Sequence, residues 1–282
     1  MALKHGLSII TVIFQILTAY VLSIYFPVVS NMKKSMQILL LASFSCLVCF
    51  ALYFLSPSFC YLTSTVAGSV RQLPIYSVER ADNKLSISFD ASWGAEKTEK
   101  ILDILDEYGV KATFFLVNIW LEDYPDMARE IAARGHEIGL HSVSHPQFST
   151  LSVSQMQEEL QGNFKMIKDI TGVEAGLFRP PFGDYNNSVI ETVNAEGFIP
   201  IQWSIDSLDW KELSADEITS RVLKNIGAGD IVLFHNDGLH TPEALPKILE
   251  SLKQKELQAV PISELLLQGD TFIDATGRQK KK

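Results

Sequence analysis

The sequence predicts an α/β fold, in which short parallel strands alternate with helices around a sheet or barrel, preceded by an N-terminal transmembrane helix or helices. From residue 84 onward, short β-rich runs alternate with longer runs of helical period, and this pattern is typical of βα units. Near the N-terminus, residues 7–29 and 36–70 contain no Asp, Glu, Lys or Arg. Such long uncharged stretches indicate membrane attachment or processing.

The first apolar run leaves two topologies open. If residues 6–29 and the second run both span as a hairpin, Lys33 and Lys34 face outward and the C-terminal part is cytoplasmic. However, Met32 followed by these two lysines looks like a start codon with a basic n-region. We therefore hypothesise that residues 1–31 are an apolar N-terminal extension that comes from a mis-assigned start.

The second run, residues 38–55, is long enough at about 1.5 Å per residue to cross a hydrocarbon core of about 30 Å. It follows the two lysines and shows no clear small-x-small cleavage site. We expect an uncleaved signal anchor over residues 32–57, followed by a linker over residues 58–83. The positive-inside rule then predicts a single-pass protein of the cell membrane, with the large domain extracytoplasmic.

Seven strands are expected in the main domain, which we place at residues 84–268: residues 85–89, 112–117, 137–140, 176–178, 198–203, 230–234 and 257–261. Six helices are expected between them: residues 98–108, 125–134, 152–170, 187–196, 215–225 and 242–253. Ser214 and Thr241 are suitable N-cap residues. Residues 269–282 end in Gln-Lys-Lys-Lys and predict a solvated, poorly ordered polar tail.

Charge and cysteine content exclude some functions. The 282 residues carry 24 Lys and Arg against 33 Asp and Glu, a formal net charge of −9. Because basic side chains supply most of the affinity for phosphates, we expect no nucleic-acid partner. Cys46, Cys49 and Cys60 all lie in or beside the second apolar run, so the main domain has no thiol for a disulfide or zinc finger. The sequence carries no signal for an oligomeric state.

Polar residues with catalytic potential follow five expected strands: Asp90, His141, Arg179, Asp206 and His235. In βα barrels the active site is assembled from these strand ends, because their loops converge on one mouth. His141 and His145 also have a spacing that can direct two imidazoles at one cation. Taken singly, Asp90 also fits a turn and His235 a satisfied core histidine. Their joint position favours a functional site.

The same residues resemble the polysaccharide deacetylases of carbohydrate esterase family 4, also called the NodB homology domain. The resemblance covers about residues 85–267 and runs in family order through SFDA (88–91), HSVSH (141–145), RPPFG (179–183), DSLDW (206–210) and LFH (233–235). It implies a distorted (β/α) barrel of the NodB type. The stretch FDASWG behind a membrane anchor looks most like the PdaB-like subgroup associated with sporulation.

The resemblance implies a catalytic role for four residues. Asp90 would be the general base held by Arg179, and His235 would be the general acid oriented by Asp206. A carboxylate that takes a proton from water suits amide hydrolysis. A cation beside the carboxylate would keep it ionised.

The resemblance also implies substrate-binding residues. Trp210 and Leu233 would line the pocket for the acetyl methyl group. Phe182 stands where the family often has Tyr. The backbone N–H of Tyr185 or a neighbour would help to hold the oxyanion.

A divalent metal is implied as well, with His141 and His145 as ligands; zinc, cobalt and nickel all suit imidazole. The family usually has a third, acidic or amide ligand at the position of Ala91, which has no donor atom. Catalytic zinc normally has three protein ligands, so we expect weaker binding unless another group substitutes. The candidates are Asp184, Ser92, Asp209 and extra waters.

Three functions follow. The first is a membrane-anchored hydrolase that removes N-acetyl groups from an amino sugar of peptidoglycan, or of a related N-acetylated glycan, during spore formation. The second is a glycan-binding or structural protein of the spore envelope that retains the barrel but lacks the third metal ligand. The third is a membrane protein whose barrel serves interaction alone. The sequence does not identify the sugar.

Overall fold

The computed structural model describes residues 71–282 without a gap, and eight scattered residues between positions 33 and 50. Arg71–Lys282 form one compact unit. The expected extension (residues 1–31), most of the expected anchor (residues 32–57) and the linker up to residue 70 lie outside the described residues. Within the described part of the chain, no helix has both the length and the apolar character needed to cross a bilayer.

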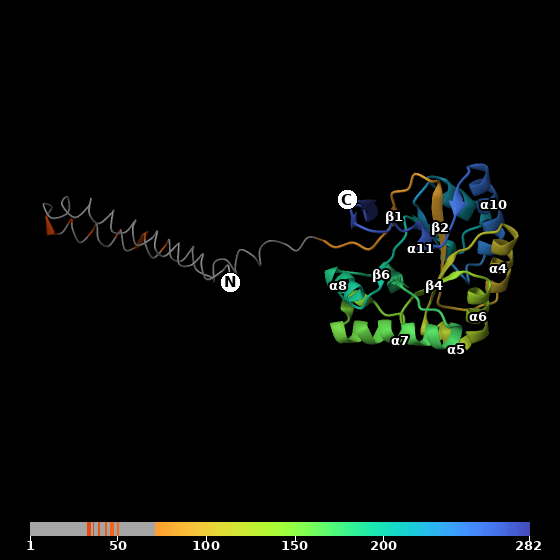
Figure 1. The fold of residues 1–282 in the computed structure, drawn as a ribbon, viewed down its shortest axis with the longest axis horizontal. Coiled ribbons are helices and arrows are strands. Elements are labelled where there is room, and N and C mark those ends of the chain that lie inside the picture. The colour runs from red at the N-terminus through yellow and green to blue at the C-terminus, as the bar shows by residue number, and fades with distance from the viewer. Residues whose placement is uncertain are drawn as a thin grey trace. The chain divides into compact units, whose positions relative to one another are not determined.

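A sheet forms the centre of this unit (Figure 1). Its strand order is β6-β5-β4-β3-β2-β8-β7. Its strands are β2 (Lys84–Ala91), β3 (Thr113–Leu116), β4 (Glu137–Leu140), β5 (Leu177–Phe178), β6 (Ile199–Pro200), β7 (Ile205–Asp206) and β8 (Ile231–His235), and β9 (Gln258–Ala259) pairs with β2. Every pair in this sheet is parallel. The edge strands β6 and β7 are separated by only residues 201–204, so the chain itself brings the two edges together as a distorted barrel.

The six expected helices are all present: α4 (Thr98–Glu107), α6 (Pro125–Ala133), α7 (Val153–Thr171), α8 (Asn187–Ala195), α9 (Ala215–Leu223) and α10 (Thr241–Gln254). The short helices α5 (Asn118–Asp123) and α11 (Ile262–Leu265) were not predicted, because they are too short to show a helical period. Ser214 forms a capping box with Glu217, as expected. Thr241 is not an N-cap: His240 takes that position and Thr241 begins the helix.

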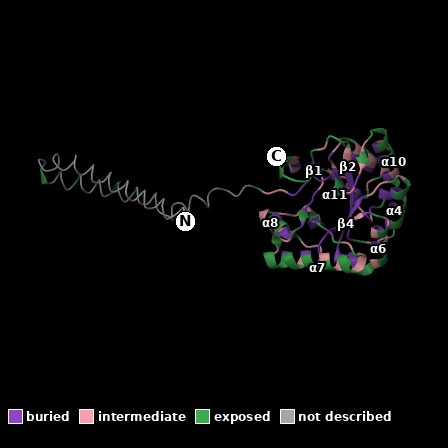
Figure 2. Cartoon of the chain, in the orientation of Figure 1, coloured by how far each residue is buried: buried purple, intermediate pink, exposed green. Residues whose placement is uncertain are grey.

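The core lies between the sheet and the helices. In Figure 2 the strands are buried, whereas the outer faces of the helices, α7 most clearly, are exposed. Seven of the eight residues of β2 are buried, as expected for a strand covered on both faces, although its sequence KLSISFDA alternates apolar and polar residues. The Phe89 ring stacks on Phe114 and Phe234, with centroid distances of 4.8 and 5.6 Å. This packing fixes the middle of the sheet and hence the positions of its strand ends.

The two ends of the described unit form a second sheet, and here two predictions are wrong. Strands β1 (Ser77–Val78), β11 (Arg278–Lys281) and β10 (Thr271–Ile273) pair in the order β1-β11-β10. The tail is therefore structured, because Gln279 is buried and accepts a hydrogen bond from the Leu267 N–H at 2.9 Å. The expected boundary between linker and domain, at residue 83, is also wrong. The chain is part of the domain well before this residue, since the Ile75 N–H donates to the Pro200 carbonyl of the barrel at 2.9 Å.

Replacement of Gln279 tests the structural role of the tail. We expect Gln279→Ala to lower the free energy of unfolding by about 1–3 kcal/mol, because the partly buried Leu267 N–H loses its acceptor. Chemical denaturation of the full chain measures this change. Lys282→Ala is the matched control, since its exposed ion pair with Asp270 contributes at most about 1 kcal/mol. Equal effects of the two substitutions would contradict a structural role for Gln279.

Candidate active site

The carboxyl ends of the parallel strands surround one cavity of about 720 Å³, which we call the strand-end hollow. Among its lining residues are Asp90, His141, His145, Asp206 and His235. As the sequence predicts, these residues lie at the ends of strands or in the loops that follow them. His141 and His145 share the loop after β4, and the other three residues come from three different strands. The volume falls within the range of about 300–1,000 Å³ that is usual for small-ligand pockets.

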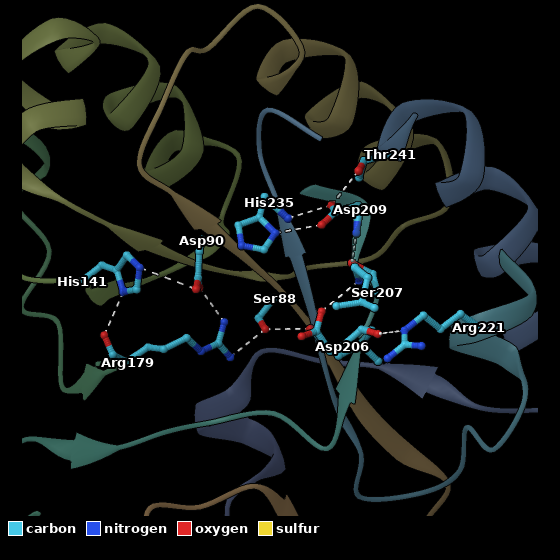
Figure 3. A network of polar contacts seen from close by, with 12 residues as sticks. Ser88, Asp90, His141, Arg179, Asp206, Ser207, Asp209, Arg221, His235 and Thr241 are labelled. Carbon is cyan, nitrogen blue, oxygen red and sulfur yellow. Dashed lines mark hydrogen bonds and ion pairs between the residues drawn. The ribbon is translucent and has the colours of Figure 1, made fainter. Parts of the chain in front are cut away.

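A buried ion pair holds Asp90. An Nη1–H of Arg179 donates to Asp90 Oδ1 at 2.7 Å, and both side chains are almost completely buried (Figure 3). Burial alone would raise the pKa of Asp90, but the charges of Arg179, His141 and His235 together with the Arg179 hydrogen bond outweigh it and lower the pKa. The expected contact between Arg179 and Asp90 is therefore present, and the carboxyl group is ionised at neutral pH.

Arg179 is itself fixed from several sides. Its Nη2 donates to Ser88 Oγ at 2.9 Å and to the Gln202 carbonyl at 3.2 Å. Its guanidinium lies over the Phe115 ring, 4.1 Å from the centroid, and 5.6 Å from the Trp203 ring centroid. Cation–π contacts of this kind are stronger where water is excluded. The pair is therefore a rigid feature of the barrel wall.

The prediction that Asp206 orients His235 is wrong, because Asp209 holds this position. His235 Nδ1 donates to Asp209 Oδ1 at 2.8 Å, and the His235 backbone N–H donates to Oδ2 at 2.9 Å. Thr241 Oγ1 also donates to Oδ2, at 2.7 Å. Asp206 instead accepts from the Leu208 N–H at 2.9 Å and so closes the turn that brings Asp209 inward. Figure 3 shows Asp209 between His235 and Thr241.

The Asp209 carboxylate changes the protonation of His235. Burial would lower the pKa of His235, but the hydrogen bond that His235 donates to Asp209 and the charges of Asp209, Asp90 and Asp237 together raise it. With Nδ1 engaged, Nε2 is the ring nitrogen left to exchange a proton with a ligand in the hollow. Gly238 makes this packing possible, because a Cβ there would lie 2.6 Å from Asp209 Oδ2.

His141 and His145 are neutral imidazoles on one loop. The Arg179 carbonyl can only accept, so His141 donates to it from Nδ1 at 2.8 Å and leaves the Nε2 lone pair free. That Nε2 lies 3.6 Å from Asp90 Oδ2. Burial lowers the pKa of both histidines, that of His145 to about 4. Their ring centroids are 5.0 Å apart.

Helix α7 holds the loop between these histidines. Glu159 accepts from the backbone N–H groups of Val143 and Ser144, both at 2.8 Å, and Asn163 accepts from the His141 N–H at 2.9 Å. Gly162 lies between them on the same face, where an added Cβ would come within 2.8 Å of Val143. The loop is thus fixed before any ligand binds.

The donor set does not complete a metal site. Two neutral imidazoles and the opposed lone pairs of His141 and Asp90 suit a cation, but Ala91 is fully buried in the hydrophobic core. Within residues 71–282 and the other described positions, no group of three or more His, Cys, Asp or Glu could hold a metal ion. Two of the residues considered as a replacement third ligand already accept hydrogen bonds. Asp184 accepts from the Ser149 N–H and hydroxyl, and Asp209 accepts from His235. Ser92 lines the hollow.

Three of the four expected substrate-binding residues line the strand-end hollow: Trp210, Leu233 and Phe182. Trp210 and Phe182 are strongly exposed, while Leu233 is buried in β8. Tyr185 is not among the lining residues. Its hydroxyl pairs with the Tyr76 hydroxyl at 2.9 Å, and the oxyanion role expected of its backbone N–H stays a prediction.

Comparison with known proteins identifies the family. A family model described as "Polysaccharide deacetylase" matches residues 77–200. A peptidoglycan-N-acetylglucosamine deacetylase of Bacillus cereus is 33% identical over 196 residues, which cover 68% of this chain and 92% of that protein. The chain belongs to the polysaccharide deacetylase family.

Other relatives of this deacetylase-family chain include an uncharacterized protein and a pseudoenzyme. The uncharacterized protein YlxY of Bacillus subtilis is 32% identical over 70% of this chain, and the match spans less than two thirds (62%) of YlxY. Wild-type BA3943 of Bacillus anthracis, a CE4 family pseudoenzyme, is 33% identical with a TM-score of 0.66, over 68% of each chain. A BA3943 mutant with restored enzymatic activity has the same TM-score at 34% identity, over 68% of this chain and 70% of that one. The family thus contains both active and inactive proteins.

Some residues of this deacetylase-family site were missed by sequence reasoning. Trp93, Lys97, Glu212 and Asp237 also line the strand-end hollow. Trp93 and Asp237 lie within three residues of Asp90 and His235, so proximity to a strand end was the available signal. For Asp209, the signal was the second acidic residue of the DSLDW motif, but the sequence does not show which of the two turns inward.

The pairing of His235 with Asp209 predicts a titration. We expect Asp209→Asn to lower the pKa of His235, because the charge that favours the imidazolium is removed while the fold of the turn is retained. Histidine Cε1–H NMR signals followed across pH measure this shift in the full chain. Asp206→Asn is the matched control from the same motif and should have the smaller effect. A larger shift in the control would restore the original assignment to Asp206.

Proposed function

We propose that this chain is an N-deacetylase that hydrolyses the acetamide of an amino sugar in peptidoglycan. The observation that carries the proposal is the pairing of Asp90 with His235 in register on adjacent strands β2 and β8. Each is held by its own buried partner, Arg179 or Asp209. One ionised carboxylate and one readily protonated imidazole therefore face the same hollow. The names of the deacetylase relatives support an acetylated peptidoglycan sugar as the substrate.

The two groups suit opposite proton transfers in amide hydrolysis. Asp90 takes a proton from the attacking water, whose oxygen adds to the acetyl carbonyl carbon. His235 gives its Nε2 proton to the sugar nitrogen as the C–N bond breaks. The products are acetic acid and the amino sugar, the acid gives its proton to the freed amine or to solvent and becomes acetate, and one proton returns from Asp90 to His235 through solvent. Their different environments push the two pKa values apart, which is the usual basis of an acid–base pair.

A divalent metal such as zinc remains part of the proposal as an expectation from the family. When bound, such an ion polarises a carbonyl and acidifies a water. His141 and His145 are the residues of this chain that would hold it. Because the third donor is missing at Ala91, no step above depends on the ion.

The cellular setting is proposed on sequence alone. The apolar run at residues 38–55 after two lysines supports a single-pass membrane anchor with the domain outside the cytoplasm. The FDASWG stretch supports the PdaB-like subgroup and a role in sporulation. Both belong to the same proposal, since peptidoglycan lies on that side of the cell membrane.

A second function is favoured by a specific observation. Ala91 is buried in the core and offers no ligand atom, and a pseudoenzyme is among the relatives. On this alternative the chain is a glycan-binding or structural protein of the spore envelope without turnover. Retention of the two buried dyads favours the enzyme, because each places a charged group in the core that binding alone does not require.

Acetate release from peptidoglycan fragments and chitooligosaccharides separates these functions. We expect the full-length chain to release acetate, and Asp90→Asn to reduce the rate at least about a hundredfold, because the base that takes the water proton is lost. Parallel reactions with zinc, cobalt or chelator show whether the ion matters. Glycan binding without acetate release under every metal condition would establish the non-catalytic alternative. Equal rates for Asp90→Asn would refute the assignment of the base.

Restoring the missing donor tests the metal site. We expect Ala91→Asp to bind zinc more tightly than the parent chain, and zinc to raise its melting temperature, because the ion stabilises the folded state that binds it. Without zinc the variant should be less stable, since it buries a carboxylate without a partner. Ala91→Val controls for added volume and should respond to zinc no more than the parent chain does. An unchanged zinc affinity would mean that position 91 does not limit metal binding.

A further inference from the structure

Exposed apolar side chains gather at the strand-end hollow. Nine large hydrophobic side chains within residues 71–282 are strongly exposed, and four of them line this hollow: Trp93, Phe182, Trp210 and Leu239. Exposed apolar groups that collect at one place mark a binding surface. Phe182 and Trp210 belong to the motifs already assigned to substrate binding. Trp93, which is 59% exposed, has no role in the chemistry derived above.

The backbone that carries Trp93 is rigid. The carbonyl of the next residue, Gly94, accepts from Trp120 Nε1–H at 2.6 Å and from Asn236 Nδ2 at 2.7 Å. The preceding residues Ala91 and Ser92 are buried. An exposed indole on a fixed backbone loses little conformational freedom when it binds a ligand. The ring is therefore presented to solvent by well-anchored neighbours on both sides.

Trp93 also forms part of a row of rings. Its ring meets His145 edge-on at a centroid distance of 6.3 Å, and His145 meets Phe182 edge-on at 4.5 Å. His145 in turn lies beside His141 in the centre of the site. The row gives the hollow an aromatic wall that continues from the reacting groups to the exposed indole.

We propose that Trp93 forms a second sugar subsite, which stacks on the pyranose next to the sugar whose acetamide lies between Asp90 and His235. The inference rests on the proposed function and deepens it. A pyranose ring has a face of C–H bonds that packs on an aromatic ring, while its hydroxyl groups stay in water at the rim. An indole ring whose apolar face is exposed and whose edges are in contact with solvent suits this ligand. The preferred ligand is therefore an oligosaccharide of N-acetylated amino sugars and not a single sugar.

Affinity as a function of chain length tests the subsite. We would titrate the full-length chain, purified in a mild detergent, with N-acetylglucosamine and with its tetramer, and determine both dissociation constants by NMR or calorimetry. We expect Trp93→Ala to reduce the ratio of tetramer affinity to monomer affinity about tenfold. Trp93→Leu keeps the apolar bulk without the flat ring and should show the same loss. Trp93→Phe should retain most of the ratio.

Phe272→Ala is the matched control, since Phe272 is an exposed ring on β10 that does not line the hollow. Its ratio should equal that of the parent chain. If Trp93→Ala does not fold, the same measurement is made on Trp93→Leu. A folded variant whose ratio of tetramer affinity to monomer affinity equals that of the parent chain overturns the subsite. In that case acetate release by the parent chain leaves the proposed function standing. A parent chain that neither binds the tetramer nor releases acetate overturns both.

Discussion

The buried ion pair between Asp90 and Arg179 is the interaction on which the rest of the site depends. A carboxylate without a partner in this position would be expensive to bury. Arg179 provides that partner with its guanidinium, and with its backbone carbonyl it also sets the tautomer of His141. One residue at the end of a two-residue strand therefore fixes both the ionised acid and the neutral imidazole beside it. This explains why the guanidinium is held by a hydroxyl, a carbonyl and two aromatic rings.

Backbone strain is concentrated around the same hollow. Seven non-glycine residues in the described chain have positive φ, and five of them lie in the loops that carry the site: Ser142, His145, Phe182, Leu208 and Glu212. Such conformations cost about 1–3 kcal/mol each and persist only where the surroundings enforce them. For Ser142 and His145, the hydrogen bond from the His145 N–H to Ser142 Oγ, at 2.9 Å, and the contacts of Glu159 with the same loop enforce these conformations. Part of the stability of the barrel is thus offset by the cost of holding these loops in place.

The sequence predicts the barrel well because its signal is local. Apolar β-rich runs and helical periods identify the seven expected strands and six helices, and the strand ends then locate Asp90, His141 and His235. The exchange of Asp206 for Asp209 could not be predicted in this way. Both are acidic residues of one motif, and Leu208 with φ of 54° turns the chain between them. Which carboxylate faces inward is decided by the path of that loop.

The sequence did not predict the strands at the two ends of the domain, for a different reason. Strand β11 is short and rich in lysine, so residues 278–281 looked like a disordered tail, although this strand lies between β1 and β10. Their partner β1 lies about two hundred positions earlier in the chain, and its two residues have no recognisable period. Pairing between such distant and short segments leaves no local trace in the sequence.

The small sheet of β1, β11 and β10 has a mechanical consequence. The chain that precedes Ser77 is also attached to the barrel, through the hydrogen bond from the Gln72 N–H to Asn187 at 2.9 Å and the contact of Arg71 with Tyr185. Tension applied to the polypeptide before residue 71 is therefore absorbed by these contacts and by the β1–β11 ladder. Strand β2, which carries Asp90, follows these attachments in the chain, so such tension loads them before it reaches β2 along the backbone.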